Sequence, residues 1–536
     1  MSCGLLLSAP RAEEAEAQKV PIDQTAQLPK ESAVVLRLPS MDRLDALAKR
    51  FKAVAGMAGN PAMKQFIDAG VSNALMVQMG LDPQGFDRTQ PIYLAFNEKS
   101  DEPLMLMRSA KENGITGQKQ LPNGASLVVK DGLVHVGGAD MLAAERRGTP
   151  LKMLDGDLAV RFLIADLVSR NKEDVDAAFE EMKKEMGQDM GQMLPMELAI
   201  DPVVAMLKGG LYGVNTIDLS ATVKEDIILT QGVISTRAES GLRKMLARAG
   251  APRENNLSDF LPGEAFLTLD FAVTPDWPGL EAAEFIKAVA GNEMGEAVMQ
   301  MMTTTKQMWS MFSGRAATSI TLQGMMGGNM HMLYELKEGS DASKLFEKYD
   351  VNTINETLKK IGIPMTYTFE RNIAKHGETA LHRISIASDD PNFQQVAMLG
   401  NSYMAAEGNH MFMVVSPNAE LEIKDLIDRV RKGEGKPGVH SKAMDRLGRK
   451  RSMGMTLNLG ALKPLLMFAA MMDQSGQANQ FLNAMPDEMS MSTAVSMHEG
   501  DISWKGDIPI KKILKMMEDV NALRGDGGGA GDSEFD

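Results

Sequence analysis

The sequence LPKESAVVLRL at residues 28–38 returns at residues 261–271 as LPGEAFLTLDF. Each copy begins with a Leu-Pro turn and continues into alternating apolar and polar residues, which is the pattern of a half-buried β-strand. A segment with helical character follows the strand. Repetition of a turn, a strand and a helix at this distance indicates a duplicated architecture.

Three further pairs of segments support the repeat, and all four pairs occur in the same order. Each pair combines period-2 strands with a turn or a following helix, and the first of the three is a predicted hairpin with a turn rich in glycine. The pairs are residues 130–136 with 406–413, 158–164 with 453–459, and 219–234 with 491–508.

These pairs predict two tandem homologous halves, residues 27–252 and 257–524, joined by a turn-rich linker at residues 253–256. Antiparallel hairpins separated by helices indicate an α+β fold, in which each half is mainly antiparallel sheet with long helices packed on one face. Residues 525–536 are rich in glycine and acidic side chains, which predicts a disordered tail.

The chain starts with MSCGLLLSAPRA, a short apolar run that ends in small residues. This pattern resembles the second part of a secretory signal peptide with a loose cleavage site at residues 9–12. The positively charged n-region of a signal peptide is missing. A start site assigned too far downstream would explain its absence. We expect residues 1–26 to be a truncated signal peptide with a linker, and the mature protein to be periplasmic or extracellular. A cytoplasmic protein is the alternative.

The composition excludes several classes of function. The chain has 57 Lys and Arg residues against 71 Asp and Glu residues, and a net charge of −14 argues against nucleic acid as a partner. A single cysteine excludes a disulfide framework and a thiolate-only zinc site. No apolar stretch reaches the roughly 18 residues of a membrane-spanning helix, so residues 465–472 are predicted to be a buried helix segment.

Methionine is unusually frequent, at 44 residues, and it adjoins histidine in three predicted strands, at residues 330–332, 410–413 and 497–498. Thioether and imidazole ligands together suit Cu(I). In a strand, however, Met330 and Met332 share one face while His331 points to the other, so the three cannot chelate as a local unit. We interpret these residues as core methionines and hydrogen-bonded histidines and predict no metal site.

Two long helices are predicted from apolar residues at helical spacing. One apolar stripe runs from Met294 to Phe312 and the other from Phe179 to Met190. Both stripes consist largely of methionine, which fits its use as core filler.

The string GEGKPG at residues 433–438 matches G-x-G-x-x-G. A dinucleotide site requires this string after a strand and at the start of a helix, whereas here a charged helical segment precedes it. A plain loop is therefore predicted. No P-loop, HExxH, GxSxG or EF-hand motif occurs, and we predict no catalytic residue, no cofactor-binding residue and no cofactor.

A basic cluster lies just before a predicted strand, and it consists of Lys442, Arg446, Arg449, Lys450 and Arg451. Such a run is most often a solvated connection between elements. Contact with an anionic partner or headgroup is the alternative.

The Leu-Pro openings, from Leu28 to Leu47 and from Leu261 to Phe271, together with the strands at Leu158 and Met453, resemble a family of exported bacterial repeat proteins. These proteins belong to a domain-of-unknown-function family in which a Leu-Pro turn, an alternating strand and a helix recur. The resemblance covers most of the chain. It implies the architecture and export, and it transfers no catalytic residue.

We expect a non-enzymatic exported binding or scaffolding protein of the bacterial cell envelope. One alternative is a carrier of an apolar small molecule or lipid, because methionine-rich surfaces repack around varied ligands. An enzyme with a dispersed active site is the other. The expected partner is a protein of unknown identity or an apolar ligand. Peripheral membrane contact stays open, and the sequence does not predict the oligomeric state.

Overall fold

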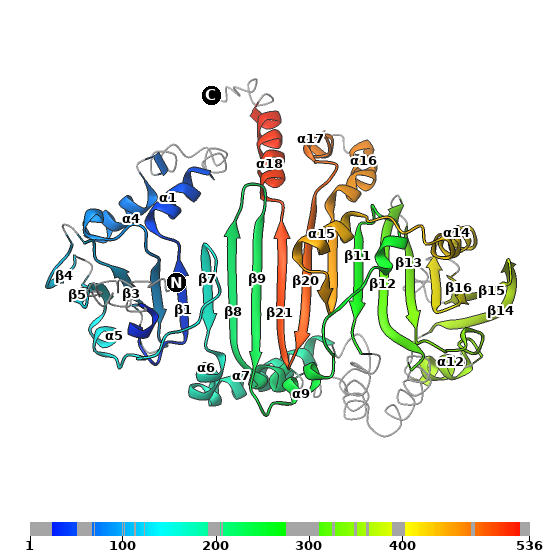
Figure 1. Cartoon of the computed structure of the whole chain (residues 1–536), viewed down its shortest axis with the longest axis horizontal. Coiled ribbons are helices and arrows are strands. Elements are labelled where there is room, and N and C mark those ends of the chain that lie inside the picture. Colours follow the sequence, from blue (N-terminus) through cyan, green and yellow to red (C-terminus); the bar gives the residue numbers. More distant parts are fainter. Residues whose placement is uncertain are drawn as a thin grey trace, which may run out of the picture.

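One antiparallel sheet of 19 strands runs the length of the molecule (Figure 1). This computed structural model describes residues 24–525 except for residues 51–66, 69, 99, 101, 112–113, 123, 191–203, 205–206, 275–309, 324–326, 348–350, 361–363, 389–401 and 473–476. The combination of this sheet with helices confirms the predicted mixed α+β class. The predicted signal peptide, apart from its last residues, and nearly all of the predicted tail lie outside the described residues, as does most of the stripe from Met294 to Phe312.

The strands divide into an earlier and a later set along the chain. The earlier set is β1 (Val34–Leu38), β2 (Ile92–Phe96), β3 (Leu104–Arg108), β4 (Gln118–Gln120), β5 (Ser126–Lys130), β6 (Leu133–Gly137), β7 (Leu158–Phe162), β8 (Val214–Val223) and β9 (Ile228–Thr236). The later set is β11 (Leu267–Ala272), β12 (Phe312–Gln323), β13 (Gly327–Leu336), β14 (Thr366–His376), β15 (Thr379–Ala387), β16 (Ser402–Glu407), β17 (His410–Val415), β19 (Met453–Asn458), β20 (Ser490–His498) and β21 (Asp501–Ile508).

The two sets meet where β9 pairs with β21, from Ile228 opposite Ile508 to Ile234 opposite Ile502. Outward from this seam the earlier strands follow the order β9, β8, β7, β1, β2, β3, β6, β5, β4. The later strands follow the order β21, β20, β19, β11, β12, β13, β17, β16, β15, and then β14. Figure 1 shows the seam near the middle of the sheet.

The predicted hairpin at residues 130–136 is present as β5 and β6, with Lys130 paired with Leu133. Its two turn residues, Asp131 and Gly132, have φ values of 53° and 74°. Positive φ at both central residues is the requirement of the tight turn whose twist matches that of the strands, and Asp-Gly meets it at little steric cost. The corresponding segment at residues 406–413 forms the hairpin of β16 and β17.

Helices are distributed along both sets of strands. They are α1 (Met41–Arg50), α4 (Val71–Gln78), α5 (Ala139–Ala143), α6 (Ile164–Arg170), α7 (Lys172–Met190), α9 (Gly241–Ala247), α12 (Val351–Lys360), α14 (Ala419–Lys432), α15 (Val439–Leu447), α16 (Lys463–Met472), α17 (Gln477–Ala484) and α18 (Ile510–Gly525). Short 3₁₀ segments are η1 (Gln24–Gln27), η2 (Pro83–Gly85), η3 (Leu257–Phe260), η4 (Ala342–Lys344) and η5 (Leu459–Leu462).

The expectation that helices cover only one face of the sheet is wrong. In β3, Met105 packs in a core with residues of α1 and α4, while its neighbour Leu106 packs in another core with Met141 of α5. Because successive side chains of a strand point to opposite faces, both faces are buried here. The same alternation occurs in β17, where Met411 and Phe412 belong to different cores. The continuous apolar run of β3, from Leu104 to Met107, is the pattern of a strand that is buried on both faces.

The predicted linker is part of the packed structure. Arg253 and Glu254 form the short strand β10, which pairs with β18 (Lys450–Arg451). The side chain of Asn255 is buried and donates hydrogen bonds to the carbonyl oxygens of Phe271 and Ala316. Residues 253–256 are therefore tied to the later set of strands.

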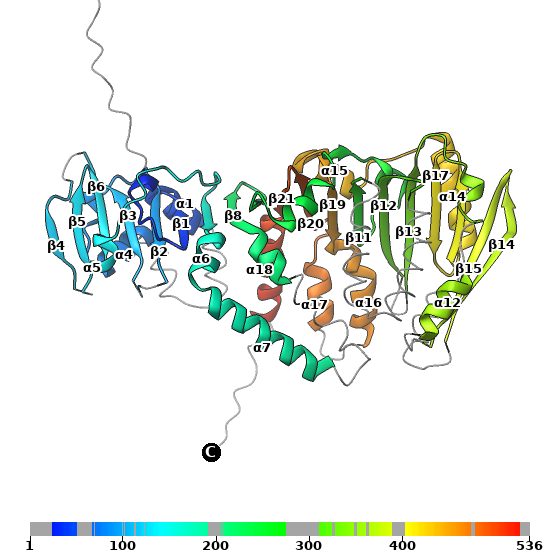
Figure 2. The same ribbon diagram turned by 90° about the horizontal axis from the view of Figure 1, so that it is seen from below.

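Residues 465–472 lie in α16, as predicted, but the expected burial is wrong. Met467, Phe468 and Met471 are 57%, 37% and 83% exposed. A continuous apolar run covers every side of a helix, whereas these three side chains lie on a side of α16 that the described residues leave exposed. Figure 2 shows α16 on the same side of the sheet as α17 and α18. None of the described helices is long and apolar enough to cross a membrane.

Candidate functional site

The basic cluster predicted from the sequence is divided among different environments. Arg451 is buried in β18, so the interpretation of the cluster as a solvated connection is wrong for this residue. Arg449 lies at the surface, 2.7 Å from the carboxylate of Asp445 one helical turn earlier. Lys442 and Arg446, on α15, line a pocket beside the seam.

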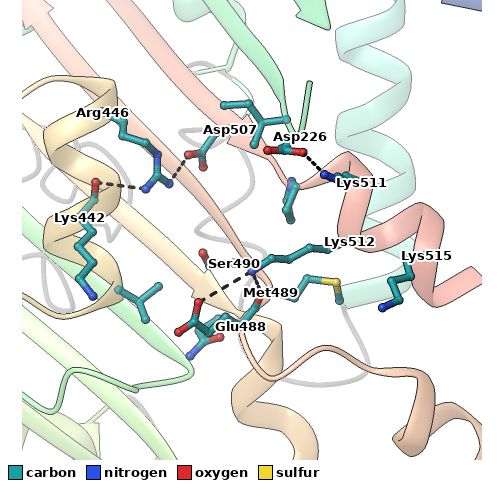
Figure 3. A pocket seen from close by; sticks show the side chains of 14 residues that line it. Asp226, Lys442, Arg446, Glu488, Met489, Ser490, Asp507, Lys511, Lys512 and Lys515 are labelled. Carbon is teal, nitrogen blue, oxygen red and sulfur yellow. Dashed lines mark hydrogen bonds and ion pairs between the residues drawn. The ribbon is translucent and has the colours of Figure 1, made fainter. Parts of the chain in front are cut away.

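This pocket, which we call the basic pocket, has a volume of about 460 Å³ (Figure 3). It is bounded by the β8–β9 turn, by α15, by the ends of β19 and β21, by the start of β20 and by the first turns of α18. Its charged and polar lining residues are Asp226, Lys442, Arg446, Asn458, Glu488, Ser490, Asp507, Lys511, Lys512 and Lys515.

Three of the cations in the basic pocket have carboxylate partners. Arg446 donates to buried Asp507 at 2.6 Å. Lys511 lies 2.8 Å from Asp226, an ion pair that raises the pKa of the lysine. In the third pair the charged atoms are farther apart, with 4.0 Å between Lys512 Nζ and Glu488 Oε2. Figure 3 shows Lys442 and Lys515 on opposite sides of these pairs.

Behind the basic pocket, a buried polar network surrounds Asp270 of β11. The Arg451 Nε donates to Asp270 Oδ1 at 2.9 Å, and His440 Nε2 lies 3.0 Å from Asp270 Oδ2. Burial alone would raise the pKa of this carboxyl, but its hydrogen bonds to His440 and Arg451 lower the pKa overall. Loss of either partner would leave a buried charge without its counter-charge, so the network requires Asp270 and Arg451 together.

The network continues from His440 toward the pocket. His440 Nδ1 lies 2.9 Å from Thr456 Oγ1, and the Thr456 hydroxyl donates to Ser492 Oγ at 3.1 Å. The backbone N–H of Ser492 donates to Asp507, the partner of Arg446. Hydrogen bonds therefore hold the wall of the basic pocket to the buried charges.

A second pocket, which we call the apolar pocket, lies between the helices α1 and α4 and the strands β1, β2, β3 and β6. Its volume is about 380 Å³. Its lining is mostly aliphatic and methionine side chains: Leu38, Leu44, Leu75, Met76, Met79, Ile92, Leu94, Pro103, Met105, Ala125 and Val136. Among its lining residues, Glu102 is the one with a charged side chain, and it is exposed.

Polar contacts at the helix ends fix the roof of the apolar pocket. Asp45 of α1 accepts hydrogen bonds from the backbone N–H and the hydroxyl of Ser72, at 2.9 and 2.7 Å. Arg88 donates to the same carboxylate at 2.8 Å and also to Asn73. These bonds join α1 to α4 at the edge of the pocket and engage the polar side chain of Ser72, which is one of its lining residues.

The three Met-His segments do not come together as one group, although those in β13 and β17 lie on paired strands, with Met332 opposite Met413. His331 of β13 is buried 3.0 Å from Glu422 of α14, and burial, only partly opposed by that carboxylate, lowers the pKa of the imidazole. His410 lies in β17 on the neighbouring strand, whereas His498 is exposed at the end of β20. Within the described residues, no group of three or more His, Cys, Asp and Glu side chains could hold a metal ion.

The other motifs have structural roles. Residues 433–438 connect α14 to α15, and Gly433 ends α14 with a φ of 64°, a left-handed conformation that favours glycine. The stripe from Phe179 to Met190 lies on α7, where Phe179 is buried with Val204 and Met182 is 36% exposed. The side chains of Met186 and Met190 lie outside the described residues.

Sequence reasoning identified neither pocket. The basic pocket combines Asp226, Asn458 and Lys515, which are far apart in the chain and come together only through the β9–β21 seam. The available signals were the basic cluster that includes Lys442 and Arg446 and the start of α18, where three lysines occur within five residues.

Comparisons with known proteins do not identify a family for this chain. No protein-family model and no curated protein matches the sequence. A solved structure titled "Structure of crystal form III of TP0453" aligns with 48% of this chain and 96% of its own, at 6% sequence identity and a TM-score of 0.18. A similarity of this size supports no conclusion about fold or function.

Proposed function

We propose that the protein is a non-enzymatic exported binding protein of the bacterial cell envelope, and that its ligand is an apolar small molecule or lipid. The observation that carries the proposal is the apolar pocket between α1, α4 and the sheet. Its volume of about 380 Å³ falls within the range of roughly 300–1,000 Å³ that is typical of small-molecule sites.

The lining of the apolar pocket indicates the class of ligand. Burial of apolar ligand surface against it is favourable because water leaves both surfaces. Met76, Met79 and Met105 can adjust to ligands of different shape, since methionine has a flexible and polarisable side chain. The Glu102 carboxylate at the exposed side disfavours an anionic group there, so we expect a ligand without negative charge at that end.

The envelope location rests on the short apolar run at the N-terminus and on the resemblance to exported repeat proteins. Both stay predictions. The predicted signal peptide is tested by expressing the gene with its upstream codons. The N-terminus of protein recovered from the periplasm is then sequenced to locate any cleavage.

The duplication is part of the same proposal: we infer two related halves that meet at the β9–β21 seam. Its support is that strands on both sides of the seam pair in the same order. In addition, the repeated segments at residues 28–38 and 261–271 lead into β1 and β11, which occupy the same place in that order.

A scaffolding role is the second candidate, and the exposed apolar side chains of α16 favour it. Met467 and Met471 lie one turn apart and are 57% and 83% exposed. Contiguous exposed apolar residues often mark protein contacts. Replacing both with glutamate is expected to abolish any concentration-dependent association seen by light scattering. An unchanged profile would remove the support that α16 gives to this role.

The ligand proposal is tested with two tryptophan substitutions on the same helix. Leu75 lines the apolar pocket and is 40% exposed, so Leu75→Trp can fill the pocket without a large loss of stability. Val77 is 65% exposed and lies outside the pocket lining, so Val77→Trp is the matched control. We expect Leu75→Trp to weaken binding of the neutral probe N-phenyl-1-naphthylamine by at least about tenfold.

Native mass spectrometry, combined with solvent extraction of purified protein, gives the second measurement. A co-purifying apolar molecule that Leu75→Trp displaces and Val77→Trp retains would support the proposal. Equal probe binding by both variants, with no apolar molecule in the extract, would contradict it.

A further inference from the structure

The basic pocket contains more positive charge than its own carboxylates neutralise. Five cationic side chains and three carboxylates line it, which leaves a surplus of two positive charges in a chain of net charge −14. Like charges that converge from separate elements repel one another. Their convergence on one cavity is therefore best explained by a ligand that supplies the missing negative charge.

The surplus is located on two residues. Arg446, Lys511 and Lys512 each face a carboxylate. Lys442 of α15 and Lys515 of α18 have no ion pair in the part of the chain that the structure describes. Lys442 lies on one side of the three ion pairs and Lys515 on the other, so both walls of the pocket carry an unneutralised cation (Figure 3).

A buried amide provides an independent indication of a ligand. Asn458 at the end of β19 lines the pocket and is 6% exposed, and its Oδ1 atom has no hydrogen-bond partner among the described residues. A buried polar atom without a partner is costly, roughly 1–3 kcal/mol. A half-turn of the amide exchanges its oxygen with its NH₂ group, so Asn458 can offer a donor to an anionic oxygen or an acceptor to a P–OH group.

We propose that the basic pocket binds a phosphate group, either of a soluble phosphomonoester or of a lipid headgroup. A phosphomonoester carries a charge of about −1.5 to −2 at neutral pH and several acceptor oxygens, which matches the surplus of two charges. A single carboxylate would neutralise only one of the two surplus charges. Lysine ammonium groups suit this role because they bind phosphate as compact point charges.

Calorimetric titration of the full chain with inorganic phosphate and with glycerol 3-phosphate tests the site. We expect Lys442→Gln combined with Lys515→Gln to weaken phosphate binding by at least about tenfold, and Arg at both positions to retain it. Asn458→Asp keeps the size of the side chain but adds a negative charge, and should weaken binding as strongly. Circular dichroism verifies that each variant is folded.

Lys119 and Lys337 give the matched control, because both are exposed and neither lines the basic pocket. Their double replacement with glutamine removes the same charge and should leave the affinity unchanged. If the control weakens binding as much as the pocket variant, or if wild-type protein binds neither phosphate compound nor phosphatidic acid vesicles, the proposal is wrong.

Vesicle flotation distinguishes the two sources of phosphate. Phosphatidylcholine vesicles with added phosphatidic acid should retain wild-type protein, but not the Lys442 and Lys515 variant, if the group is a headgroup. Binding of glycerol 3-phosphate without vesicle binding supports a soluble phosphomonoester. This site is separate from the apolar pocket, so failure here leaves the proposed apolar ligand untouched.

Discussion

Two charged residues that align in the similar segments 28–38 and 261–271 lie in very different surroundings. Arg37 of β1 is partly exposed and lies 3.9 Å from the fully exposed carboxylate of Asp155. Asp270 holds the equivalent position in the second repeated segment, on β11, and it is completely buried between Arg451 and His440. A charge in an alternating strand therefore does not reveal whether it is solvated or forms part of the core.

The largest expected effect is at Asp270. Asp270→Asn keeps the shape of the side chain but leaves the guanidinium of Arg451 buried without its counter-charge. Removing one partner of a buried pair typically costs about 3–5 kcal/mol of unfolding free energy. Urea denaturation at neutral pH measures this loss.

Asp218 on β8 is the matched control for that experiment. It accepts hydrogen bonds from Arg161 at 2.6 and 2.9 Å, but Arg161 keeps 18% of its side-chain surface exposed. Because water can replace part of this interaction, Asp218→Asn should cost less, about 1.5–3 kcal/mol. The contrast between the two regions fails if Asp218→Asn proves as destabilising as Asp270→Asn.

The regions around His135 and Asp270 should lose stability at different pH values as the solution is acidified. Burial, reinforced by the charges of Arg146 and Lys130, lowers the pKa of His135 on β6 to about 4. The unfolded chain binds this proton near pH 6.5, so stability falls as the pH decreases from about 6.5 to about 4, by up to about 3 kcal/mol. Asp270, with its lowered pKa, loses its contribution only below its ordinary value of about pH 4.

Hydrogen exchange of peptides that cover β5 and β6 measures this difference at about pH 5 and pH 7. We expect faster exchange at the lower pH in these peptides than in those that cover β11. His135→Leu should remove the dependence. A β5–β6 hairpin whose protection is the same at both pH values would show that His135 does not set the acid sensitivity of this region.

The smallest effect is expected at Arg37. Exposed ion pairs contribute roughly 0–1 kcal/mol, and the partner here is fully solvated. Arg37→Gln should change the unfolding free energy by less than about 0.5 kcal/mol. A larger loss in urea denaturation would mean that Arg37 has a role comparable to that of Asp270, and the two positions would then be alike.

Local features of the fold were predictable because they depend on neighbouring residues. The alternation in residues 28–38 and 261–271 located β1 and β11, and the Asp131-Gly132 turn located a hairpin. Helical spacing from Phe179 to Met190 located α7. The strands and the helix follow from the periodicity of apolar side chains, and the hairpin follows from its turn residues.

Long-range features were not predictable, since periodicity does not identify what an element packs against. Arg451 seemed part of an exposed basic run, yet it pairs with a carboxylate 181 residues earlier in the chain. The apolar run of α16 indicated burial without showing which side would remain exposed. Both pockets depend on such distant contacts. The sequence singled out Lys442 and Arg446 as basic residues, but it did not show which residues of other elements meet them in the basic pocket, and it assigned no residue of the apolar pocket.

The β9–β21 seam has a consequence for how the chain is made. Thr236 at the end of β9 contacts Asp501 at the start of β21, 265 residues later. During synthesis, the edge of β9 therefore waits for almost half of the chain before its partner strand exists. An unpaired strand edge is a template for aggregation, and contacts of high sequence separation form slowly. Closure of the sheet at β9 thus depends on β21, the last strand among the described residues, and chains that end before residue 501 would carry an open edge into the cell.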